Sequence, residues 1–137
     1  MKGVVRFGVA MEGPLLKQFD ASIHARGYAN RSEAIRDLIR ADLAQVAWER
    51  GDNSVATITI VYDHHVRELT ERLNTIQHDY GQHVVSTLHV HLTHHKCLEV
   101  IVARGRANVL KKMADEITRT RGVLVGSITA APAEDDA

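Results

Sequence analysis

The sequence has a single cysteine, no excess of charge and no long apolar run, and each absence excludes a class of protein. One cysteine among 137 residues cannot form an internal disulfide, which is typical of proteins in a reducing cytoplasm. The 17 basic and 17 acidic residues cancel, so no global positive field points to nucleic acid. No apolar run approaches the ~18–20 residues of a membrane span, and the lone lysine near the start does not make a signal peptide. We therefore expect a cytoplasmic protein with no membrane partner.

Residues 1–50 have the pattern of one short strand followed by two helices. The run 4–11 alternates weakly with period two, as a strand does, and 13–28 and 30–50 carry helical apolar stripes, the second beginning after an N-cap at Asn30. So few elements cannot close a core alone, and an unpaired strand invites another chain. We expect a dimeric unit in which two strands pair as an antiparallel ribbon over four helices.

A polar linker at 51–54 precedes a second unit, in which strands and helices follow the order βαββαβ. The predicted strands are 56–62, 83–92, 96–104 and 123–130, and the predicted helices are 65–81 and 108–122. This order is the ferredoxin-like, or ACT-like, arrangement, and the fold class is α+β. We expect this domain to occupy 55–131 and to be followed by a frayed acidic tail at 132–137.

Histidine is concentrated in one part of the chain, where eight of nine lie between His64 and His95, beside the only thiol, Cys97. Imidazole and thiolate together bind late divalent metals, which leaves nickel, copper and zinc open. A single strand histidine is more often a solvated or hydrogen-bonded residue than a ligand. We assign that role, or at most a weak secondary metal site, to His64, His65, His83, His94 and His95, and place His24 on a helix surface.

The hairpin at 83–104 carries the strongest metal signal. His89 and His91 are two residues apart, so on a strand both point to the same face. A turn at 93–95 pairs His91 with Cys97 and, two residues on, His89 with Glu99. The alternate residues form an apolar face that we expect to pack on the helices, with the metal donors on the opposite face. That apolar face consists of Leu88, Val90, Leu92, Leu98, Val100 and Val102.

His78 is the candidate for a fourth ligand. It lies about 200° around the helix from Ile76, so it faces away from its own sheet. We infer that it reaches the hairpin of a neighbouring subunit, which makes metal binding and assembly one event. Binding needs a deprotonated thiol and neutral imidazoles, so we expect it to weaken as the pH falls.

Two segments of the sequence resemble a known family. NRSEAIRDLIR, after a strand and a helix, resembles the ribbon-helix-helix DNA-binding motif, and QHDYGQHVVSTLHVHLTHHKCLEVIV resembles the regulatory domain of the nickel-responsive repressors called NikR. The similarity runs from about Val4 to Ala130. It implies a homotetramer, a dimer of dimers joined through the C-terminal domains, with Ni(II) in a square plane at the tetramer interface. The implied ligands are His89, His91 and Cys97 of one chain and His78 of another.

The resemblance also implies that the ribbon enters the major groove of operator double-stranded DNA. By position, the outward residues of the ribbon are Arg6, Gly8 and Ala10. An arginine that pairs bidentately with guanine gives roughly 1–3 kcal/mol of discrimination. Family members commonly have Ser or Thr where this chain has Gly8 and Ala10, so two hydroxyl contacts per strand are missing.

The start of the second helix is a candidate phosphate site, because its free N–H groups and dipole attract anions. The residues there are Asn30, Arg31 and Ser32. Glu33 and Asp37 match a pair that, in the family, helps bind a second cation when DNA is engaged. The alternative is that they balance arginines on a solvated helix face.

These observations lead to a nickel-sensing transcriptional regulator, most simply a repressor, that binds operator DNA when Ni(II) is bound. Gly8 and Ala10 leave open an oligomeric metal sensor or buffer with weak DNA recognition. A metal-assisted hydrolase is the third reading. It is disfavoured because four filled ligand positions leave no place for an activated water, so we do not expect an enzyme.

Overall fold

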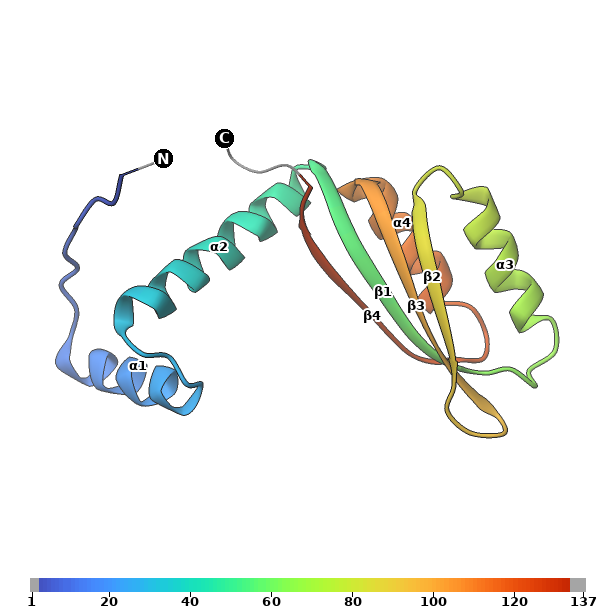
Figure 1. Ribbon diagram of the computed structural model, residues 1–137, viewed down its shortest axis with the longest axis horizontal. Helices are drawn as coiled ribbons and strands as arrows, with labels where there is room; N and C mark the ends of the chain where they lie inside the picture. Colours follow the sequence, from blue (N-terminus) through green and yellow to red (C-terminus); the bar gives the residue numbers. More distant parts are fainter. Residues whose placement is uncertain (1–2, 134–137) are drawn as a thin grey trace. The chain divides into compact units, whose positions relative to one another are not determined.

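A computed structural model describes residues 3–133, with an α+β arrangement of four helices and four strands in that range (Figure 1). In chain order the elements are α1 (Gly13–Ala25), α2 (Arg31–Glu49), β1 (Asn53–Asp63), α3 (Leu69–Asp79), β2 (Val84–His91), β3 (Lys96–Arg106), α4 (Ala107–Thr118) and β4 (Val123–Pro132). The contacts divide the chain into two compact units between Ala41 and Asp42. None of the helices in the described range has the length and apolar character needed to cross a bilayer.

The first unit contains α1 and the start of α2. Asn30 caps α2 as predicted, since its side-chain oxygen accepts a hydrogen bond from the Glu33 N–H at 2.9 Å. The Arg31 guanidinium joins the two helices by donating two 2.8 Å hydrogen bonds to the Asp20 carboxylate. Gly27, with a φ of +82°, allows the tight connection after α1.

The strand predicted over 4–11 does not form within the single chain, where residues 3–12 have no strand assignment. A strand needs a neighbour to receive its backbone hydrogen bonds, and this segment has no partner strand among the described residues. Its apolar side chains are open to solvent, with Val5, Phe7 and Val9 exposed by 83%, 70% and 63%. The ribbon of two paired strands therefore stays a prediction about two copies.

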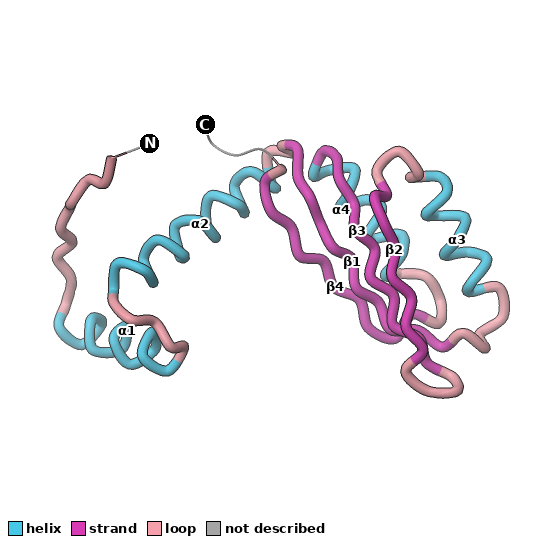
Figure 2. Tube along the Cα trace, viewed as in Figure 1, coloured by secondary structure: helices cyan, strands magenta, loops and turns pink. Residues whose placement is uncertain are grey.

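The second unit confirms the predicted βαββαβ order. Its strands form one antiparallel sheet in the order β2-β3-β1-β4, and Figure 2 shows α3 and α4 on the same side of this sheet. Side chains from both helices and from alternate positions of the two central strands make the core. The fully buried members include Ile58, Ile60, Tyr62, Leu73, Ile76, Ile101, Leu110, Met113 and Ile117.

The prediction that the apolar hairpin face packs on the helices is wrong. On β3 the buried row is Cys97, Glu99, Ile101 and Ala103, whereas the intervening Leu98, Val100 and Val102 are only half-buried. The metal donors therefore lie on the helix-covered face. The buried row continues that of β1, where Ile58, Ile60 and Tyr62 alternate in the same sense. The alternation favoured the wrong face, because the face that the helices cover carries His89, His91 and Glu99.

The segment predicted as a linker at 51–54 is held by backbone hydrogen bonds. β1 already begins at Asn53, and the Asp52 carbonyl accepts from the Ala107 N–H at 3.1 Å. At the other end, β4 continues to Pro132, the first residue of the predicted acidic tail. Residues 134–137 of that tail lie outside the described residues.

Truncating Ile101 to alanine should destabilise the protein by about 2–5 kcal/mol, because the side chain is fully buried between the sheet and its helices. The measurement is urea unfolding followed by circular dichroism. Leu124→Ala is the matched control, since Leu124 is 54% exposed and should cost less than about 1 kcal/mol. Equal losses for the two variants would contradict the assignment of the core.

Candidate metal centre

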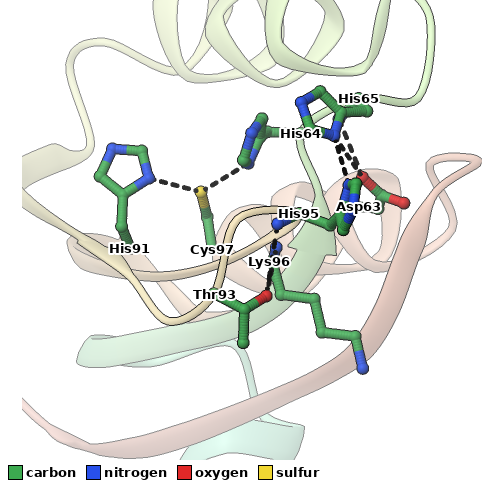
Figure 3. Close-up of polar contacts among 8 residues, drawn as sticks. All are labelled: Asp63, His64, His65, His91, Thr93, His95, Lys96 and Cys97. Atoms are coloured by element: carbon green, nitrogen blue, oxygen red, sulfur yellow. Dashed lines mark hydrogen bonds and ion pairs between the residues drawn. The ribbon is translucent and has the colours of Figure 1, made fainter.

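The β2–β3 hairpin places the predicted donors in the predicted register. His91 pairs with Cys97 and His89 with Glu99, and the Leu92 N–H donates to the Lys96 carbonyl at 2.9 Å. His91 Nδ1 lies 3.4 Å from Cys97 Sγ (Figure 3). Cys97 is completely buried and is the first residue of the covered row on β3.

A second imidazole, that of His64, approaches the same thiol, although its sequence context indicates at most a weak secondary metal site. His64 Nδ1 lies 3.2 Å from Cys97 Sγ, on the other side of the sulfur from His91 (Figure 3). His64 follows the end of β1, where Tyr62 is the cross-strand neighbour of Cys97. Its backbone N–H donates to the His95 carbonyl at 3.0 Å, which fixes this segment against the hairpin turn. The pairing of β1 with β3 is what brings His64 to the thiol, and the sequence alone did not provide that pairing.

The separations of these three donors suit one metal ion. His64, His91 and Cys97 each offer one ligand atom, all within 4.8 Å of one another. With metal–sulfur and metal–nitrogen bonds of about 2.3 and 2.0 Å, donors at a right angle lie about 3.1 Å apart and tetrahedral ones about 3.5 Å apart. The observed 3.2 and 3.4 Å fall within this range, so the donors need little movement to share an ion.

Burial shifts the pKa of two of the three donors, Cys97 and His64. It raises the pKa of the Cys97 thiol, and the nearby Glu99 and Asp63 carboxylates raise it further. Burial also lowers the pKa of His64, with the neighbouring His65 and His91 acting in the same direction. The imidazole is therefore in its neutral, metal-binding form near neutral pH. The thiol keeps its proton until a metal displaces it, so metal affinity falls as the pH falls.

His89 lies beside this cluster, with its ring centroid 5.1 Å from that of His91. Its Nδ1 is 3.4 Å from the Tyr62 hydroxyl and 3.8 Å from the Glu99 carboxylate. Burial raises the pKa of Glu99, an effect that His89 and the hydrogen bond from Gln77 oppose. Among the described residues, the group of donor atoms within 4.8 Å of one another holds His64, His91 and Cys97 and does not include His89, so its role as a ligand stays a prediction.

His78 is not brought to the cluster of its own chain. It is exposed on α3, where it lines a surface hollow. The other residues of that hollow are Thr70, Glu71, Asn74 and Thr75. Its outward position agrees with the expectation that it serves another copy, which stays a prediction.

The residues predicted to contact DNA all lie in the first unit and are exposed. Arg6, Gly8 and Ala10 are in the unpaired N-terminal segment. At the start of α2, Ser32 is exposed, Asn30 is used as the N-cap and Arg31 pairs with Asp20.

Of the predicted second cation pair, Asp37 is engaged within its own unit and Glu33 lies in the first turn of α2. Asp37 accepts a 2.7 Å hydrogen bond from the Tyr28 hydroxyl and lies 3.3 Å from the Arg40 guanidinium. That ion pair matches the alternative of balanced charge on a helix face. The cation site stays a prediction.

Known proteins similar to this chain agree on one family. A family model described as the NikR C terminal nickel binding domain matches residues 55–131. Proteins named "Putative nickel-responsive regulator" are 52% identical in Solibacter usitatus, over 94% of each chain, and 50% identical in Pyrococcus furiosus, over 92% of each. A further relative of that name, from Geobacter sulfurreducens, is 52% identical over 93% of each chain.

Among solved structures, an uncharacterized protein of Thermotoga maritima matches with a TM-score of 0.50 and 11% identity, over 61% of this chain and 100% of that one. This likeness concerns the fold alone. The family match covers the stretch in which Cys97, His91 and His64 converge. The chain belongs to the NikR family of nickel-responsive regulators, and residues 55–131 are its nickel-binding domain.

Proposed function

We propose that the protein is a nickel-sensing transcriptional repressor that binds operator DNA when Ni(II) occupies a site shared between subunits. The observation that carries the proposal is the fully buried Cys97 thiol, with the His91 and His64 imidazole nitrogens 3.4 and 3.2 Å away. A buried thiol flanked by imidazole nitrogens is a donor set for a late divalent metal. The regulator names of the relatives supply the link from metal to transcription.

The proposed ligands are His89, His91 and Cys97 of one chain with His78 of a second. β2 is an edge strand, so its histidines lie where another copy can approach. His78 is exposed and turned outward on α3. His64 competes with it for the fourth position, because it already touches the sulfur. Bound nickel would supply a bridge between donors that otherwise belong to separate subunits.

A hydrogen-bonded link joins the helix of His78 to the strand of His89. Gln77, the residue before His78, donates to the Glu99 carboxylate at 3.2 Å and accepts from the Thr87 hydroxyl at 3.0 Å. Glu99 in turn faces His89. Ligation at either histidine therefore restrains the same contact between α3 and the hairpin. This supports a mechanism in which nickel orders α3 and biases the arrangement of the DNA-binding units.

Two separate apolar surfaces support the proposed dimer of dimers. One is the N-terminal segment, with exposed Val5, Phe7 and Val9, which can pair with its counterpart in a second chain. The other is the sheet face opposite the helices, where Leu88 and Val90 are exposed by 60% and 37%. One surface would make a dimer and the two together a tetramer.

DNA binding is proposed for the first unit. Paired N-terminal segments would form the ribbon that presents Arg6 to base edges, and the start of α2 would hold phosphate. Because Gly8 and Ala10 offer no polar side chain, Arg6 carries most of the base discrimination. A metal buffer without specific DNA binding is the second candidate, and these two residues favour it.

The test is a selection from a random double-stranded DNA library with and without one equivalent of Ni(II), followed by anisotropy titration of the enriched sequence. Nickel should tighten binding at least tenfold, and by linkage the DNA should tighten nickel by the same factor. Arg6→Ala should remove most of the sequence preference but little nickel binding, with Mg(II) as the metal control. If no sequence is enriched, the buffer function replaces the proposal.

A further inference from the structure

A second group of metal-binding side chains lies beside the first, on the solvent side of the same loops. Asp63, His65 and His95 each offer one ligand atom, and these atoms lie within 4.8 Å of one another. The His65 and His95 Nδ1 atoms are 2.7 Å apart, and His65 Nδ1 is 3.9 Å from the Asp63 carboxylate (Figure 3). None of these three residues belongs to the ligand set proposed above.

The sheet register and hydrogen bonds from backbone N–H groups to side-chain oxygens hold the three donors in place. Asp63 ends β1 opposite Lys96, so it is fixed by the sheet register. Its carboxylate accepts from the His65 N–H at 2.9 Å, which orients one donor against another. The turn that carries His95 is closed by the Thr93 hydroxyl, which accepts from the N–H groups of His95 and Lys96 at 3.3 and 3.1 Å. The donors thus converge before any ion arrives.

The donor set defines the class of ion. Two imidazoles and one carboxylate bind late first-row divalent metals, and three protein ligands leave positions for water. Two nitrogens at about 2.1 Å from a metal and at a right angle to each other lie about 3.0 Å apart, so the rings must separate by a few tenths of an ångström. His65, whose side chain is 47% exposed, and the exposed His95 can make that shift.

We propose that Asp63, His65 and His95 form a second site for a late divalent metal ion, weaker than the Cys97 site and filled after it. It is weaker because it is exposed and lacks a thiolate. It shares a loop with the first site, since His64 and His65 are adjacent and their rings lie 4.2 Å apart. The His64 N–H also donates a hydrogen bond to the His95 carbonyl, so a residue at the Cys97 site is directly bonded to a residue of the second site.

The test is equilibrium dialysis of the full chain against graded free Ni(II), with bound metal measured by mass spectrometry. We expect two equivalents per chain in the unaltered protein. The double variant His65→Gln with His95→Gln should lose only the weaker one and keep the sulfur-to-nickel absorption band of the Cys97 site. Asp63→Asn should lower the affinity for the second equivalent of nickel at least tenfold. Cys97→Ala should still bind that weaker equivalent.

His24→Gln is the matched control, because His24 is an exposed histidine in the other unit. It should bind both equivalents as the unaltered chain does. Two equivalents in the His65/His95 double variant, or a second equivalent lost with His24→Gln, would overturn the second site. Neither result bears on nickel-dependent DNA binding, so the proposed function stands or falls separately. Circular dichroism of each variant verifies that the fold is intact.

Discussion

Replacing Cys97 with alanine should abolish the sulfur-to-nickel charge-transfer absorption and weaken nickel binding by about 100-fold or more. Apparent binding free energies of about 10–16 kcal/mol for zinc at structural four-donor sites imply about 3 kcal/mol for each donor, and we expect a similar contribution for nickel. Cys97 contributes the only sulfur in the chain besides the methionines. The fold should tolerate the change, because alanine removes one buried atom at the end of the core row.

His64→Gln and His78→Gln form a matched pair that identifies the fourth donor. If the second subunit supplies it, His78→Gln loses the tight site, and His64→Gln keeps it with a changed pH dependence. If the site closes within one chain, the effects are reversed, because His64 Nδ1 already lies 3.2 Å from the sulfur. Absorption titration with Ni(II) at several pH values separates the two outcomes.

Mixing two inactive variants gives a sharper test of sharing. A chain with Cys97→Ala keeps its His78, and a chain with His78→Gln keeps its hairpin. In randomly mixed oligomers about one quarter of the sites would combine an intact hairpin with an intact His78 from the other chain. Absorption that returns on mixing demonstrates a shared site. Continued absence after demonstrated exchange of subunits would contradict it.

The hairpin register was predictable because two independent constraints agree on it. A three-residue turn and the period-two alternation both pair His91 with Cys97, and a slip of one residue would move every side chain to the other face. The face that the helices cover was not predictable from this segment. Leu98 and Val100 are as apolar as Ile101, and only the neighbouring β1 row shows which side is buried.

The position of His64 beside Cys97 could not be predicted from local sequence patterns. Its nearness to Cys97 depends on the pairing of β1 with β3, which joins residues more than thirty positions apart. The N-terminal segment was not predictable for a different reason. Its alternation was recognisable, but a strand at 4–11 requires hydrogen bonds from a second copy, which a single chain does not supply.

Replacing Leu88 with lysine should convert the proposed tetramer into a smaller species. Leu88 is 60% exposed on the edge strand β2, on the sheet face opposite the helices, so the isolated fold accommodates the charge. Burying an unpaired ammonium between two sheets costs several kcal/mol. In a closed symmetric assembly this destabilisation occurs at every copy of the contact. The measurement is molar mass by light scattering or sedimentation, with and without nickel.

Leu88→Met is the matched control, because it keeps the volume and apolar character of the side chain and should retain the mass of the unaltered protein. Dissociation by lysine should also weaken nickel binding if the ligand from the second subunit is delivered through this assembly. A smaller species that still binds nickel tightly would instead place the sheet contact and the metal contact on different pairs of subunits. An unchanged mass for Leu88→Lys would show that the exposed sheet face is not where the subunits meet, and the apolar N-terminal segments would then have to account for the assembly.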